Sequence, residues 1–261
     1  MDNNVFYALL LTLIAGLMTG VGSIMVLFVP KENKKFLSVA LGFSAGVMLY
    51  VSFIEMFPKA QEYLCDSFGM KNGVWWVTGA FFFGMVLIML IDNFIPSPES
   101  DLTAQKAGQH SATLERMGLL MALAIAIHNF PEGLATFAST LDDVSLGAAI
   151  AVAIAIHNIP EGIVTSVPIY HATGNRQKAF IISLLSGLTE PLGAVIGYLI
   201  LRPFLNSTLY GIIFASIAGI MVYIAIEELI PMAREYDKGN SMILGCIGGM
   251  IIMAVSLIMF M

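Results

Sequence analysis

Two nearly identical stretches decide the fold of this 261-residue chain. Ala124–Thr136 reads AIAIHNFPEGLAT and Ala153–Thr165 reads AIAIHNIPEGIVT, so 10 of 13 positions agree at an offset of 29. Each copy sets a histidine, an asparagine and a glutamate inside an apolar run. Apolar helices resemble one another in Ala and Ile, but that does not explain a repeated His-Asn-x-Pro-Glu-Gly. We therefore interpret the copies as a duplicated functional motif.

The composition around these motifs is that of a membrane protein. Hydrophobic residues make up 58% of the chain and charged residues 11%, with a mean hydropathy of +0.86. A soluble domain is roughly a quarter charged, because its surface faces water. This composition excludes a soluble enzyme and a disordered scaffold, and the net charge of −6 excludes a nucleic-acid binder. The distant Cys65 and Cys246 predict neither a disulfide nor a thiolate metal site.

Eight runs are long and apolar enough to cross a bilayer as helices, since a span needs about 20 residues. They cover residues 5–29, 36–57, 74–95, 118–140, 145–169, 178–201, 208–231 and 241–260. We predict an all-α membrane protein in which residues 1–261 form one transmembrane domain in contact with lipid. A polar loop at residues 96–116 joins the third and fourth spans.

Lysine and arginine residues predict the orientation of these spans. Nine of them follow the first, third, fifth and seventh spans: Lys31, Lys34, Lys35, Lys106, Arg116, Arg176, Lys178, Arg234 and Lys238. Only Lys59, Lys71 and Arg202 lie elsewhere. Because cytoplasmic loops carry the excess of positive charge, we predict that both termini lie outside and that the 96–116 loop is cytoplasmic.

A second, longer-range repeat gives the architecture. Ala45–Ala60 and Ala218–Ala233 agree at seven of 16 positions, including Glu55 with Glu228 and Pro58 with Pro231. A weaker similarity relates the first span to the sixth. The repeat predicts that spans 1–3 are inverted against spans 6–8 around a central pair, spans 4 and 5. Secondary transporters are built in this way, with their substrate site near the membrane midplane.

Seven polar side chains are predicted to lie at mid-membrane. They are His128, Asn129, Glu132, His157, Asn158, Glu161 and Glu190. One ionised side chain at the bilayer centre costs about 2.5–3.5 kcal/mol on insertion scales. Because no lysine or arginine lies in the middle of a span, the three carboxylates must be protonated or bound to a foreign cation.

The spacing of these residues favours a metal ion. Residues i and i+4 share a helix face, so His128 is expected beside Glu132, and His157 beside Glu161. Two antiparallel helices presenting such faces would surround a common pocket with nitrogen and oxygen donors, which suit zinc and other first-row divalent metals. The alternative is that these groups only hydrogen-bond one helix to the next.

The motifs HNFPEG at 128–133, HNIPEG at 157–162 and TEPLGA at 189–194 resemble the signature helices of ZIP-type divalent metal transporters, closest to the bacterial zinc-uptake branch. The resemblance implies a binuclear centre. One half would be Glu132, His157 and Glu161, with His128. The other would be Asn129, Glu132, Asn158, Glu161 and Glu190, so that Glu132 and Glu161 bridge both metals.

The resemblance also implies a function: uptake of zinc, and of iron, manganese, cadmium and cobalt, into the cytoplasm by alternating access. The location would be the bacterial cytoplasmic membrane, with a homodimer as a plausible assembly. Related chains often carry a histidine-rich loop between spans 3 and 4. Here that loop holds only His110, which argues against metal buffering by the loop.

Other interpretations stay open at this point. An intramembrane di-metal hydrolase is the competing function, although the chain has no His-Glu dipeptide and therefore lacks the zincin helix motif. Glu55 and Glu228 are helix-end carboxylates, or carboxylates at the entrance and exit of a cation path. His171 is a candidate exit ligand.

Overall fold

The computed structural model describes residues 3–25, 34–92, 110–204 and 206–260. Within these ranges the chain is helical and contains no β-strand, which confirms the all-α prediction. The elements are α1 (Asn3–Met25), α2 (Lys34–Val51), η1 (Ser52–Met56), α3 (Phe57–Phe68), α4 (Met70–Asp92), α6 (His110–Asp142), α7 (Val144–Thr173), α8 (Arg176–Gly187), α9 (Thr189–Leu201), η2 (Arg202–Phe204), α10 (Ser207–Ile224), η3 (Ala225–Leu229), α11 (Ile230–Tyr236) and α12 (Ser241–Phe260).

Seven helical stretches in the described residues are long and apolar enough to cross a membrane. The predicted fourth span lies in α6, which has 33 residues but is not one of these seven. The membrane-helix architecture is therefore confirmed, and the count of eight spans remains a prediction.

Several helices extend beyond the predicted spans. The second span continues through η1 and α3 to Phe68, and α6 begins at His110 rather than at 118. Residues 110–116 of the predicted loop are thus helical, while its residues 96–109 lie outside the described ranges. Hydropathy marks only the part of a helix that can lie in lipid, so it misses polar turns that continue beyond the membrane.

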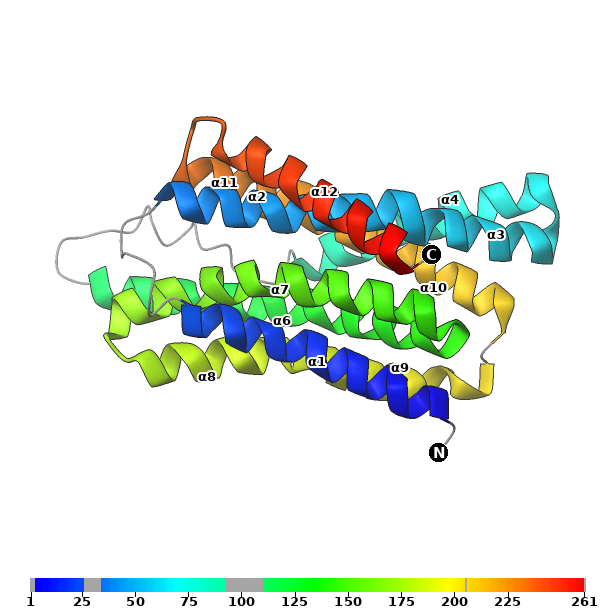
Figure 1. Ribbon diagram of the computed structural model, residues 1–261, viewed down its shortest axis with the longest axis horizontal. Coiled ribbons are helices and arrows are strands. Elements are labelled where there is room, and N and C mark those ends of the chain that lie inside the picture. The colour runs from blue at the N-terminus through cyan, green and yellow to red at the C-terminus, as the bar shows by residue number, and fades with distance from the viewer. Residues whose placement is uncertain (1–2, 26–33, 93–109, 205, 261) are drawn as a thin grey trace.

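The helices run along one long axis, and the α6–α7 pair lies at the centre (Figure 1). One group consists of this pair with α1, α8 and α9, and we call it the site group. The other consists of α2, α3, α4, α10, α11 and α12, and we call it the flanking group. The first turn of α1 and the last turn of α12 lie at the same end of the bundle (Figure 1).

Matched close contacts agree with the predicted repeat. Gly162 on α7 packs against the Thr19 carbonyl of α1, and Gly133 on α6 packs against the Glu190 carbonyl of α9. A β-carbon at either glycine would overlap the facing backbone, so only glycine permits this approach. Because α1 and the α8–α9 segment correspond in the repeat, Thr19 occupies the place that Glu190 has in the other half.

The second repeat shares a backbone irregularity. In η1 the Phe57 N–H donates to the Ser52 carbonyl, and in η3 the Ile230 N–H donates to the Ala225 carbonyl. Both bonds span five residues, which defines a π-helical turn. Pro58 follows η1 and Pro231 follows η3, and each proline removes a backbone hydrogen-bond donor. The two halves of the repeat therefore accommodate their prolines with the same wider helical turn.

The helix break nearest the centre falls in the sixth span. Helix α8 ends at Gly187 and α9 begins at Thr189, so Glu190 lies in the first turn of α9. By contrast, α6 and α7 continue as helices through Pro131 and Pro160. The break brings a carboxylate to a helix N-terminus, where the backbone dipole favours negative charge.

Candidate metal centre

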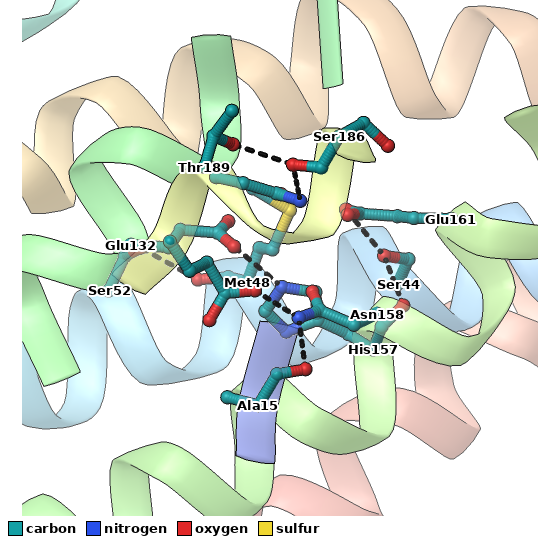
Figure 2. Close-up of polar contacts among 12 residues, drawn as sticks. Ala15, Ser44, Met48, Ser52, Glu132, His157, Asn158, Glu161, Ser186 and Thr189 are labelled. Carbon is teal, nitrogen blue, oxygen red and sulfur yellow. Dashed lines mark hydrogen bonds and ion pairs between the residues drawn. The ribbon is translucent and has the colours of Figure 1, made fainter. Parts of the chain in front are cut away.

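Three buried side chains form the core of the centre. Glu132 of α6 and His157 and Glu161 of α7 each offer a ligand atom, and these atoms lie within 4.8 Å of one another. The His157 Nε2 and Glu132 Oε2 atoms are 3.1 Å apart. All three side chains are at most 2% exposed. Figure 2 shows Ser44 of α2 beside Glu161, and Asn158 beside Ala15 of α1.

Oxygen atoms around this core lack hydrogen-bond donors. Among the described residues, five buried carboxylate and amide oxygens have no hydrogen-bond partner: Asn129 Oδ1, Glu132 Oε1, Asn158 Oδ1, Glu161 Oε2 and Glu190 Oε2. Each such atom costs about 1–3 kcal/mol when nothing satisfies it. Carboxylate and amide oxygens accept but do not donate, so they cannot satisfy one another. A cation coordinated by these oxygens would satisfy several of them together.

The two asparagines are fixed in equivalent ways. The Asn158 Nδ2 group donates to the Ala15 carbonyl at 2.9 Å, and the Asn129 Nδ2 group donates to the Ser186 carbonyl at 3.1 Å. These contacts orient both amides so that the oxygens are the unpartnered atoms. Asn158 also donates to Glu190 Oε1, which holds this third glutamate beside the α7 motif.

His128 faces a different partner from the one that its spacing predicted. Its Nε2 atom lies 2.9 Å from Glu228 Oε1 in the π-helical turn η3, and it is not part of the Glu132–His157–Glu161 group. The i, i+4 rule gives the helix face but not the neighbours on that face. Here the flanking group supplies that neighbour, the carboxylate of Glu228.

The core carries negative charge without a lysine or arginine partner. Within the described part of the chain, Glu132 pairs with His157 and Glu228 pairs with His128. The Lys59–Glu62 pair lies on α3, away from this core, and is exposed. The absence of a basic side chain at the centre agrees with the sequence-based prediction of a foreign cation.

The structure groups Glu132, His157 and Glu161 as the core, and it joins Asn158 to Glu190 beside that core. Asn129 bonds to the Ser186 carbonyl. The seventh predicted residue, His128, contacts Glu228 instead. Sequence reasoning did not select Ser44, whose hydroxyl reaches Glu161 from α2. The signal was present in Gly42-Phe-Ser-Ala-Gly46, where two glycines mark one packed helix face and the serine lies on the other. His171 has no described side chain, and its predicted role stays untested.

Comparisons with known proteins show which family the chain is similar to. The family model described as ZIP Zinc transporter matches residues 4–113 and 96–257. The chain is 54% identical over 263 residues to "Zinc transporter ZupT" of Streptococcus mutans, covering 100% of both chains. It is 53% identical to the protein of that name from Lysinibacillus sphaericus, covering 99% of both, and 52% identical to that from Chlorobaculum parvum, covering 100% of both.

Proposed function

This chain belongs to the ZIP zinc transporter family, and from that premise we propose that it carries zinc across the membrane through the Glu132–His157–Glu161 centre. It is an integral, multi-pass membrane protein and a transporter rather than an enzyme. Family membership therefore removes the di-metal hydrolase interpretation.

The convergence of the three ligand atoms within 4.8 Å carries this proposal. Zinc takes histidine nitrogen and carboxylate oxygen at about 2.0–2.2 Å, so small side-chain rotations would bring these atoms around one ion. Removal of the three groups from water is costly unless a cation compensates the carboxylates. A transported divalent ion supplies that compensation while it is bound.

We propose a second metal position beside the first. Asn129, Asn158 and Glu190 would complete it, with Glu132 and Glu161 bridging both ions. The unpartnered oxygens of these five residues support this arrangement. An oxygen-rich position suits harder ions such as manganese. We extend the proposed substrates to iron, manganese and cobalt, and also to cadmium, for which the His157 nitrogen of the core is the better donor.

Alternating access would come from movement of the site group against the flanking group. In the described residues, four polar contacts cross the boundary between them: Ser44 to Glu161, Ser44 to the His157 carbonyl, His128 to Glu228, and Tyr63 to Asp142. Tyr63 of α3 donates to Asp142, the last residue of α6. Glu228 would receive the cation on its way out, because it contacts His128 next to the core.

The direction of transport is inward in this proposal. The charge bias of the loops puts the termini outside, and the beginning of α1 and the end of α12 do lie at one end of the bundle (Figure 1). We place the protein in the bacterial cytoplasmic membrane, as one transmembrane domain per chain and with a homodimer as its assembly.

Uptake of radioactive zinc by the purified protein in sealed liposomes tests the function. Glu132→Ala and Glu161→Ala should each reduce uptake to the level of protein-free liposomes, because each removes a core ligand. Glu235→Ala is the matched control, since Glu235 is an exposed carboxylate near the end of α11. Normal uptake by either core variant, with equal protein in the vesicles, would show that the centre is assigned wrongly.

A further inference from the structure

A hydroxyl group reaches the core from the flanking group. Ser44 is fully buried on α2, and its Oγ atom lies 3.4 Å from Glu161 Oε1 and 3.5 Å from the His157 carbonyl oxygen. Both neighbours are acceptors, so the hydroxyl is the donor. Figure 2 shows this contact on the Glu161 side of the core.

The packing of α2 prevents this hydroxyl from moving away. Gly42 and Gly46 lie against the Met242 and Cys246 carbonyls of α12, and a β-carbon at either position would overlap α12. Ser44 is two residues from each glycine, which is about 200° around a helix. One face of α2 is therefore held against α12, and the opposite face presents Ser44 to α7.

The contact makes the two carboxylate oxygens of Glu161 unequal. Oε1 faces the Ser44 hydroxyl, whereas Oε2 is buried and has no donor among the described residues. Both serine contacts, at 3.4 and 3.5 Å, are longer than a usual O–H···O hydrogen bond of about 2.5–3.0 Å. The hydroxyl is thus shared between Glu161 Oε1 and the His157 carbonyl. It orients Glu161 and leaves the Oε2 atom available to a cation.

We propose that Ser44 is a positioning residue that orients Glu161 toward the cation and thereby sets the affinity and metal preference of the centre. This inference rests on the proposed transport function. The contact joins the two helix groups, so Ser44 acts on the core only in the relative arrangement that the structure shows.

Ser44→Ala tests the positioning role. Without the hydroxyl, Glu161 gains side-chain freedom that the cation must remove on binding. We expect the KM for zinc in liposome uptake to rise about threefold to tenfold, with the maximal rate unchanged. Ser52→Ala is the matched control, because Ser52 is also fully buried on the same continuous helix but bonds back to the Met48 carbonyl at 2.7 Å.

Ser44→Cys tests the metal preference. A thiol has a similar shape but is a weak donor, and its sulfur is a soft ligand. We expect the KM for cadmium to fall relative to that for manganese by about fivefold or more. Ser52→Cys should leave this ratio unchanged, because its side chain points to its own helix.

The outcomes separate this inference from the proposed function. Unchanged zinc KM in Ser44→Ala, together with an unchanged cadmium-to-manganese ratio in Ser44→Cys, overturns the role of Ser44. A loss of maximal rate without a change in KM also overturns it, because that pattern indicates a structural role. If Glu161→Ala transports zinc normally, the proposed function itself fails, whatever the serine variants do.

Discussion

The two copies of His-Asn-x-Pro-Glu-Gly have equivalent backbone neighbours but different ionisable neighbours. Asn129 and Asn158 donate to carbonyl groups at repeat-related positions, and the glycines of both motifs pack against repeat-related carbonyls. The histidines differ. His157 contacts Glu132 of the opposite motif, whereas His128 contacts Glu228 outside both motifs.

This difference shows which parts of a duplicated site stay symmetric. Close helix packing depends on glycine and on backbone carbonyl groups, so both halves need the same small residues. Metal chemistry depends on the side chains that surround each motif. Glu190 faces Asn158 in one half, but the equivalent position in the other half is Thr19. The symmetric packing therefore carries an asymmetric ligand set.

The matched pair His157→Ala and His128→Ala tests the asymmetry most directly. We expect His157→Ala to lower zinc kcat/KM by about 10–100-fold, the range for groups that support a metal site, because it removes a core ligand. His128→Ala should cost less than about tenfold, since His128 contacts Glu228 instead of the core. Initial rates of radioactive zinc uptake in liposomes measure both. Equal losses would show that the two histidines are functionally equivalent.

The contrast between Glu190 and Thr19 predicts a difference between metals. Glu190→Gln removes a charge from the oxygen-rich position but leaves the Glu132–His157–Glu161 core intact. We expect iron uptake to fall about tenfold and zinc uptake about twofold. Parallel uptake assays with ferrous iron, kept reduced, and zinc measure the two effects. An equal loss of both would contradict two distinguishable metal positions.

The pair His128–Glu228 can be measured as a coupling energy. His128→Ala, Glu228→Gln and the double variant form a cycle on zinc kcat/KM. Residues in direct contact show coupling of about 0.5–3 kcal/mol, and the 2.9 Å separation places this pair in that class. Additive effects of the two substitutions would mean that the contact has no role in transport.

Glu55 should give the smallest effect. It holds the same place in η1 that Glu228 holds in η3, but within the described residues it makes no hydrogen bond to the centre. We expect Glu55→Gln to change zinc uptake by no more than about twofold, as for a substitution outside the site. A loss as large as that of Glu228→Gln would instead indicate that both π-helical glutamates line the cation path.

The sequence by itself determined the class of the protein and most of its centre. Low charge and long apolar runs leave only a membrane protein, because the chain cannot cover a water-facing surface. Buried carboxylates without a basic partner must be protonated or bind a cation. The repeated motif therefore predicted Glu132, His157 and Glu161 before any contact was known, and the glycine repeats predicted close packing.

Tertiary structure alone decided which groups meet across helices. The helical period places His128 and Glu132 on one face, but it does not say that η3 brings Glu228 to that face. Nor does it show that α2 presents Ser44 to Glu161, or that the sixth span breaks just before Glu190. The physical reason is that periodicity fixes directions within one helix, whereas side-chain partners depend on the packing of several.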